Sequence, residues 1–173
     1  MKKVAKLALA TIEDSIRHNQ YESVHVIDAE GNLVYENLNG KKTTHGDSVY
    51  IGDAGNLEGF ILTHNHPMDS DRANHSLSDG DVKVLCNFNL SEVRAVTRSF
   101  NHSISLKSPC EYKDMIATIT YITKQMDKEI KLNYELNGID SFPFEDYNHE
   151  LWTRASKVID NLKYKRTPIK LWT

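Results

Sequence analysis

Apolar residues near the start of the chain recur at steps of three and four. This spacing predicts a helix over about residues 2–18 with one apolar side that can pack on a sheet. The residues of that side are Val4, Leu7, Ala8, Ile12 and Ile16. From Glu22 the pattern changes to two β-rich runs, residues 22–27 and 33–36, on either side of the turn sequence Asp-Ala-Glu-Gly-Asn. We expect a β-hairpin there.

Three further stretches decide the rest of the predicted sheet. Residues 60–63, Phe-Ile-Leu-Thr, form a short and wholly apolar run, which is typical of a buried central strand. Residues 93–97 and 103–106 alternate on either side of Asn101-His102 and predict a second hairpin. Residues 37–47 are polar and contain Gly40 and Gly46, so we expect a loop.

Three more apolar stripes predict the remaining helices. One follows Ser78, which is a good N-terminal cap, and contains Val82 and Leu85. A long stripe runs over residues 115–130, and another over residues 151–162. The resulting order is α-β-β-β-α-β-β-α-α. It predicts an α/β sandwich with a mixed sheet and helices added at both ends.

Size and composition narrow the class of protein. A chain of 173 residues suits one domain and is too short for a TIM barrel. Its hydrophobic content of 39% is that of an ordinary globular domain. Cys86 and Cys110 lack C-x-x-C spacing, which disfavours a disulfide scaffold and a thiolate zinc site. Because the chain has 8 histidines, imidazole and carboxylate groups are its candidate metal ligands.

Charge and hydropathy argue against two classes of partner. The net charge of −3 gives no general attraction to nucleic acid or to a membrane surface. No segment approaches the roughly 20 apolar residues that span a bilayer, and the apolar run near the N-terminus is too short for a signal peptide. We therefore expect a cytoplasmic protein without a membrane or nucleic-acid partner.

The candidate chemistry lies in the sequence Thr-His-Asn-His-Pro at residues 63–67. Residues two apart in a strand point the same way, so His64 and His66 present two imidazoles to one point. Asp81, in the first turn of the next helix, would add a carboxylate. Two histidines and one aspartate leave the fourth position of a zinc ion open, as in catalytic rather than structural sites. Such a site suits amide hydrolysis near neutral pH.

Two questions are open for the serine of this region: whether it only caps the helix, and whether Ser76 or Ser78 is the functional residue. Ser78 and Asp81 together resemble a capping box, in which the serine serves helix stability alone. Ser76 and Asp79 form a second, overlapping S-x-x-D. We favour Ser78 and Asp81, because the apolar helix face follows directly at Val82. His75 is a possible substitute ligand, but its polar surroundings favour a solvated side chain.

These residues resemble the JAMM zinc metalloproteases, also called MPN+ or JAB-domain proteins, and RadC-type and phage-encoded members in particular. The family pattern is an upstream glutamate, H-x-H, a loop and S-x-x-D. It is matched by Glu22, by His64 and His66, and by Ser78 and Asp81. The interval between His66 and Ser78 is longer than usual in the family, which indicates an insertion in that loop.

The resemblance implies a fold and a domain organisation. It covers about residues 21–107 and implies a compact JAB/MPN-like sandwich, similar to cytidine deaminases, within one domain over residues 1–173. The helical extensions would be residues 1–20 and 108–173.

The resemblance also implies a mechanism. His64, His66 and Asp81 would bind one zinc ion, Glu22 would take a proton from the zinc-bound water, and Ser78 would stabilise the oxyanion. The reaction would be hydrolysis of a peptide or isopeptide bond in a protein or peptide substrate, including ubiquitin-like conjugates. Other glutamates compete for the role of the base: Glu30, Glu36 and Glu58.

Other functions stay open at this point. The chief alternative is a non-catalytic JAB-like binding or assembly module, associated with a phage or a toxin, and a metal-dependent nuclease is a third. Metallo-β-lactamases are excluded because Met68 and Asp69 stand where they require Asp-His. The sequence does not decide the oligomeric state, or whether the bond is a peptide or an isopeptide.

The C-terminal region carries an excess of basic residues. On the predicted last helix these are Arg154, Lys157, Lys163, Lys165, Arg166 and Lys170. We expect a solvated face, or a surface for an acidic partner. We expect the aromatic residues nearby, Trp152, Tyr164 and Trp172, to pack in the core. If this region selects the substrate, truncation after Asn161 should spare zinc binding and impair turnover on the true substrate.

Overall fold

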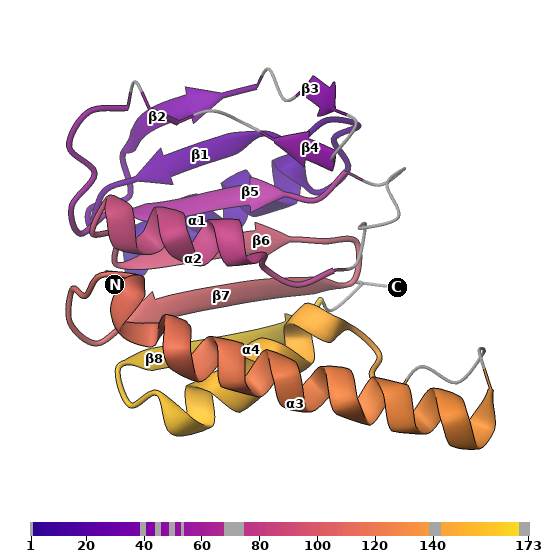
Figure 1. Ribbon diagram of the computed structural model, residues 1–173. Coiled ribbons are helices and arrows are strands. Elements are labelled where there is room, and N and C mark those ends of the chain that lie inside the picture. The colour runs from indigo at the N-terminus through magenta and orange to yellow at the C-terminus, as the bar shows by residue number, and fades with distance from the viewer. Residues whose placement is uncertain are drawn as a thin grey trace.

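The computed structural model has an α/β fold built on a six-stranded mixed sheet (Figure 1). It describes residues 2–38, 41–43, 46–48, 51–52, 54–67, 75–138 and 143–169. The strands lie in the order β2-β1-β5-β6-β7-β8. Their bounds are Val24–Ile27 (β1), Leu33–Asn37 (β2), Ile61–Asn65 (β5), Glu92–Val96 (β6), Phe100–Leu106 (β7) and Leu162–Pro168 (β8). The helices are Lys3–Ile16 (α1), Asp79–Asn87 (α2), Lys113–Asn137 (α3) and Tyr147–Val158 (α4).

One parallel pairing sets the geometry of the sheet. β5 and β6 run parallel, whereas the other neighbouring strands of this sheet are antiparallel. Parallel neighbours need a crossover connection, and here α2 provides it. The chain leaves β5 at one edge of the sheet and enters α2 at the same edge, so the end of the strand and the start of the helix lie close together (Figure 1).

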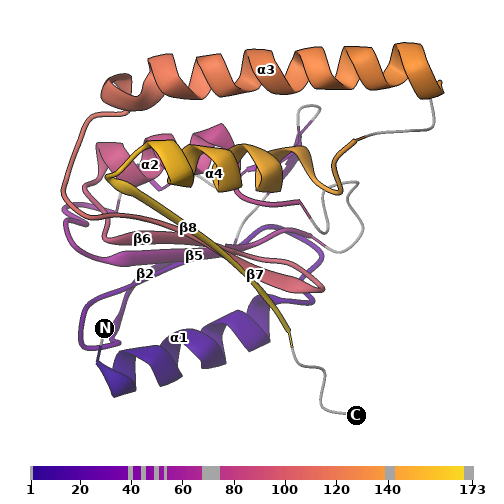
Figure 2. The same cartoon turned by 90° about the horizontal axis from the view of Figure 1, so that it is seen from below.

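The two faces of the sheet carry different helices. α1 covers one face, where Leu9 and Ile12 pack against Ile27 and Ile61. α2, α3 and α4 lie on the other face (Figure 2). The larger core there includes residues of the alternate register, among them Val24, Val26, Leu62, Val93, Ile104 and Leu162. Each strand residue can therefore be assigned to a face by its alternation.

The face under α1 contains a buried polar network. The carboxylate of Glu13, only 3% exposed, accepts hydrogen bonds from the guanidinium of Arg94 and from Asn101. Arg17 bonds to the carbonyl of Thr97 at 2.6 Å and to Asn101 at 3.1 Å. The network fixes α1 against β6, β7 and the turn between them. Burying these charges is tolerable only because they are paired.

Most of the elements predicted from the sequence are confirmed, with two local corrections. The second hairpin turns at residues 97–99 rather than at Asn101-His102, which lie inside β7. The turn forms there because Phe100 and Thr97 exchange hydrogen bonds through both backbone and side chain. The predicted loop contains two short antiparallel strands, Lys41–Thr43 (β3) and Gly46–Ser48 (β4).

The prediction of a wholly helical C-terminal extension over 108–173 is wrong at residues 162–168. The last helix ends at Val158, and the chain continues as β8, which pairs with β7 along its whole length. The physical reason is the alternation Leu-Lys-Tyr-Lys-Arg, which puts Leu162, Tyr164 and Arg166 on the inner face. The basic residues of this stretch therefore lie on an edge strand. Lys170 and Trp172 lie outside the described residues.

Within the residues that the structure describes, no helix is long and apolar enough to cross a bilayer.

Candidate metal centre

His64 lies in the buried strand β5, and His66 follows directly after the end of that strand. All five residues of β5 are buried between β1 and β6. His64 is 2% exposed and lies on the face covered by α2, because it alternates with Thr63, which contacts Glu13 of α1. The amide of His66 bonds to the carbonyl of Val96 at 2.9 Å and so extends the pairing with β6 beyond the strand. The Nε2 atoms of His64 and His66 are 3.2 Å apart.

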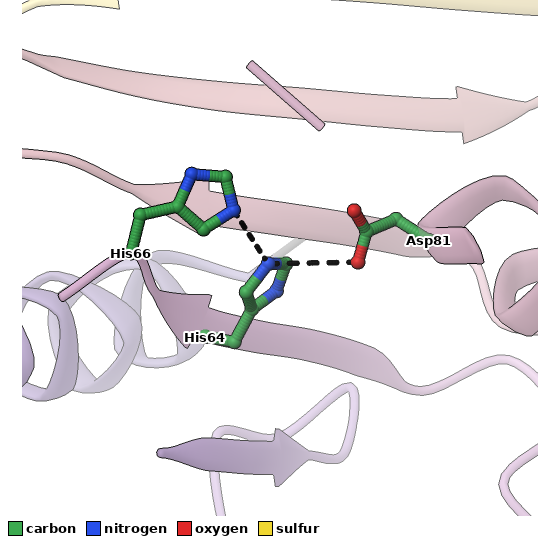
Figure 3. A group of neighbouring side chains, drawn as sticks. All are labelled: His64, His66 and Asp81. Carbon is green, nitrogen blue, oxygen red and sulfur yellow. Dashed lines mark hydrogen bonds and ion pairs between the residues drawn. The ribbon is translucent and has the colours of Figure 1, made fainter. Parts of the chain in front are cut away.

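Asp81 reaches the same point from the first turn of α2. Its Oδ1 lies 3.5 Å from Nε2 of His64 (Figure 3). Its Oδ2 accepts hydrogen bonds from the amide of Ser78 at 2.6 Å and from the hydroxyl of Ser78 at 2.8 Å. The predicted capping box is thus present and also orients the aspartate. One carboxylate oxygen is held by the helix cap, and the other faces the histidines.

The three side chains form a group that could hold a metal ion. One ligand atom from each of His64, His66 and Asp81 lies within 4.8 Å of the others. Ligands about 2.0–2.1 Å from a tetrahedral ion are roughly 3.3 Å apart. The two pair distances of 3.2 Å and 3.5 Å are close to that separation. The donor set therefore fits a small divalent ion bound by imidazole and carboxylate.

His66 is held in the form that binds metal. Its Nδ1 lies 2.8 Å from the carbonyl oxygen of His75, and a carbonyl can only accept, so Nδ1 carries the proton. Nε2 is then left with a lone pair directed toward His64 and Asp81. Burial, together with the neighbouring His64, lowers the pKa of His66 to about 4. A hydrogen bond from the second nitrogen to a carbonyl is the usual support of a metal-binding histidine.

The structure distinguishes the pair Ser76 and Asp79 from the pair Ser78 and Asp81. Ser76 is buried away from the group, where its amide bonds to Asp146 at 2.7 Å. Asp79 contacts Tyr112 and forms an ion pair with Lys83 at 2.6 Å. Ser78 and Asp81 are therefore the pair that faces the histidines. The side chain of His75 is exposed, as expected, and its backbone carbonyl is what contacts the site.

Glu22 lies just before β1 and is half-buried. In the pairing of β1 with β5, Val24 opposes His64. Continuing this register by two residues would set Glu22 opposite His66 on the same face. Its role as the base stays a prediction.

The competing glutamates lie elsewhere. Glu36 interacts with His25 at 3.7 Å, and His25 belongs to the face under α1. Glu30 is bonded to Lys2 at 2.5 Å, and Glu58 is exposed at a turn. Glu36 therefore lies on the opposite face of the sheet from the metal-binding group, and Glu30 and Glu58 lie in turns.

A buried polar cluster beside the metal-binding group was not predicted from the sequence. Its centre is the hydroxyl of Tyr164, which contacts Ser76 at 2.9 Å, His102 at 3.0 Å and His149 at 2.8 Å. Burial and the nearby His66 lower the pKa of His102 to about 3. The available signal was strand alternation, which places His102 and Tyr164 on inner faces. Placing His102 in a turn and Tyr164 on a continuation of the last helix concealed it.

Comparisons with known proteins gave no match. No family model matches this chain, and neither a curated protein nor a solved structure matches it significantly.

The group should bind one divalent ion per chain. Substituting His64→Ala or Asp81→Asn removes one of three ligands and should abolish stoichiometric binding, since two ligands do not hold zinc tightly. The measurement is elemental analysis after dialysis against zinc and then against buffer. His18→Ala, at an exposed position just after α1, is the control and should retain one equivalent. Full zinc content in the His64→Ala protein would contradict this assignment.

The metal-free protein should lose stability as the pH falls below about 6.5. A histidine in the unfolded chain titrates near that value, whereas folded His102 stays neutral down to about 3, so the unfolded state binds more protons in between. The stabilisation that comes from keeping His102 neutral is therefore fully present above pH 6.5 and is lost as the pH falls.

Chelator-treated wild type and His102→Gln, compared by urea unfolding at pH 7, 6 and 5, give the measurement. Wild type should lose about 1.4 kcal/mol more per pH unit than the variant below pH 6. The other ionisable groups near His102 are present in both proteins: His64, His66, His149, Tyr164 and Arg166. Equal pH dependence of the two proteins would show that His102 is not held neutral.

Proposed function

We propose that this chain is a zinc-dependent metallopeptidase or isopeptidase of JAMM type. The observation that carries the proposal is the convergence of Nε2 of His64, Nε2 of His66 and Oδ1 of Asp81. Three protein ligands of this kind, from a strand end and a helix start, are typical of a catalytic zinc site with an open position. The motif match to the JAMM family supports the same reading.

Some residues of the site would bind the metal ion, and others would orient those ligands or take part in the reaction. His64, His66 and Asp81 would hold the ion, and the carbonyl of His75 and the cap at Ser78 would keep His66 and Asp81 aimed at it. Bound zinc supplies a Lewis acid that polarises a carbonyl and makes water a stronger nucleophile near neutral pH. The burial of β5 holds His64 in place.

Glu22 would move the proton. In amide hydrolysis, water adds to the carbonyl carbon, the C–N bond breaks, and the leaving nitrogen gains a proton. A carboxylate at position 22, on the face of His66, could take the proton from the attacking water and return it to that nitrogen. This assignment depends on the continued register of β1, and the position of Glu36 on the other face supports it.

Ser78 has a structural task in this arrangement. Its hydroxyl donates to Oδ2 of Asp81, so stabilising an oxyanion would require the hydroxyl to turn from the aspartate to the substrate. The proposed substrates are proteins or peptides, including ubiquitin-like conjugates, on the strength of the family resemblance. The non-catalytic module is the alternative, distinguished by zinc binding without turnover.

Replacing Glu22 with Gln should abolish hydrolysis and leave the zinc content unchanged. Loss of the proton-moving carboxylate should lower kcat/KM by about 10²- to 10⁴-fold, whereas the three ligands are intact. The measurement is cleavage of a panel of peptides and ubiquitin-like conjugates by zinc-loaded protein.

Glu36→Gln is the matched control, because it makes the same change on the opposite face of the sheet, and it should retain activity. Unchanged cleavage by the Glu22→Gln protein would contradict the assignment of the base. Stoichiometric zinc with no cleavage of any substrate by wild type would favour the binding module.

A further inference from the structure

Residues 75–78 support two of the three metal-binding residues, His66 and Asp81. The carbonyl of His75 fixes the ring of His66 at 2.8 Å. The amide and hydroxyl of Ser78 fix Asp81. His64 is held independently inside β5. A displacement of residues 75–78 would therefore disturb two of the three ligands together.

The C-terminal elements hold this segment at successive residues. Oδ2 of Asp146, the N-terminal cap of α4, accepts from the amide of Ser76 at 2.7 Å. Nε1 of Trp152 donates to the carbonyl of Leu77 at 2.7 Å. The hydroxyl of Tyr164, from β8, lies 2.9 Å from the hydroxyl of Ser76. The segment before the metal ligand is thus fastened by residues from the far end of the chain.

Tyr164 connects Ser76 to two histidines of other elements, His102 of β7 and His149 of α4. A phenol hydroxyl offers one donor and two acceptor sites. Ser76, His102 and His149 supply three partners at 2.8–3.0 Å, so the hydroxyl is fully used. Burial raises the pKa of Tyr164 to about 12, which keeps the hydroxyl neutral and its donor present. The ring is held in place by this three-way bonding.

His102, one partner of this hydroxyl, lies in the same cross-strand row as the metal-binding residue His64. His64, Ala95 and His102 are direct neighbours on three adjacent strands and share one face. Ala95 has only a methyl group between the two imidazoles. His102 uses Nδ1 for Tyr164, and within the described residues its buried Nε2 has no hydrogen-bond partner. Since the two nitrogens of an imidazole point in nearly opposite directions, Nε2 is turned away from Tyr164.

We propose that Tyr164 is a positioning residue of the metal centre, acting through Ser76 on residues 75–78 and through His102 on the row that contains His64. The inference rests on the proposed function only in requiring that the group binds a metal ion. It makes β8 part of the centre, although the family resemblance ends before that strand. The expectation that truncation after Asn161 spares zinc binding is replaced by its opposite.

The test is the affinity of the 173-residue chain for zinc after the substitution Tyr164→Phe. This change removes one hydroxyl and keeps the ring in the core. Loss of a hydrogen bond that supports metal ligands lowers metal affinity by about 10- to 100-fold, and we expect about tenfold here because Tyr164 acts through intervening residues. Affinity is measured by competition with a chromophoric chelator at a temperature where both proteins are folded.

The matched control is Tyr147→Phe, which removes a hydroxyl that bonds to Asp127 at 3.1 Å between α3 and α4. It should bind zinc within twofold of wild type. The absorption spectrum of the cobalt-loaded protein gives a second readout, which should change in Tyr164→Phe and not in Tyr147→Phe. A purely structural role would lower the melting temperature without changing either readout.

Each result decides the proposal. Wild-type affinity and spectrum in Tyr164→Phe would overturn it and leave the proposed function standing. Equal losses in the two variants would overturn it as well, because the effect would then not belong to residues 75–78. If wild type itself bound no zinc, the proposed function would fail, and this inference would fail with it.

Discussion

The parallel pairing of β5 with β6 is the constraint on which the rest of the site depends. Because the chain must cross over between parallel neighbours, α2 begins at the edge where β5 ends. His66 and Asp81 are far apart in sequence and meet at that edge. β1 on the other side of β5 fixes which face His64 takes. A slip of one residue in either pairing would turn the imidazole toward α1.

Local sequence patterns predicted the parts of the site that depend on short-range geometry. The alternation of His64 and His66 and the cap formed by Ser78 and Asp81 are properties of one strand end and one helix start. The polar cluster depends on contacts between distant segments. Tyr164 meets Ser76 only because β8 pairs with β7, and an alternating stretch of seven residues after a helix is easily read as its continuation.

The fold was predictable for a similar reason. Helices with a continuous apolar stripe and hairpins with turn residues have strong local signals, and these elements are confirmed apart from the end of the last helix, which stops at Val158, and the turn of the second hairpin. The hairpin turn at residues 97–99 was misplaced because Asn101 and His102 are polar and resemble a turn. Their side chains are instead used in two buried networks, one on each face of the sheet. Buried polar residues with partners do not follow the apolar pattern on which such predictions rest.

The polar groups buried on the two faces of the sheet have different roles. Under α1, the pairing of Glu13 with Arg94 stabilises the packing of a helix. Under α2 and α4, two histidines and an aspartate converge on one point, and the lowered pKa of His66 means that this imidazole would meet a metal ion in its neutral form. A phenol, from Tyr164, and two more histidines, His102 and His149, are bonded together on the same face. Keeping such groups buried opposes folding unless each has a partner. The C-terminal strand provides partners for several of them.

X-ray absorption at the zinc edge of the loaded protein tests the central claim most directly. The account predicts a first shell of nitrogen and oxygen at about 2.0–2.1 Å, with the outer-shell scattering of two imidazoles and no sulfur. A shell containing sulfur, or one without imidazole scattering, would place the ion elsewhere and contradict the assignment to His64, His66 and Asp81.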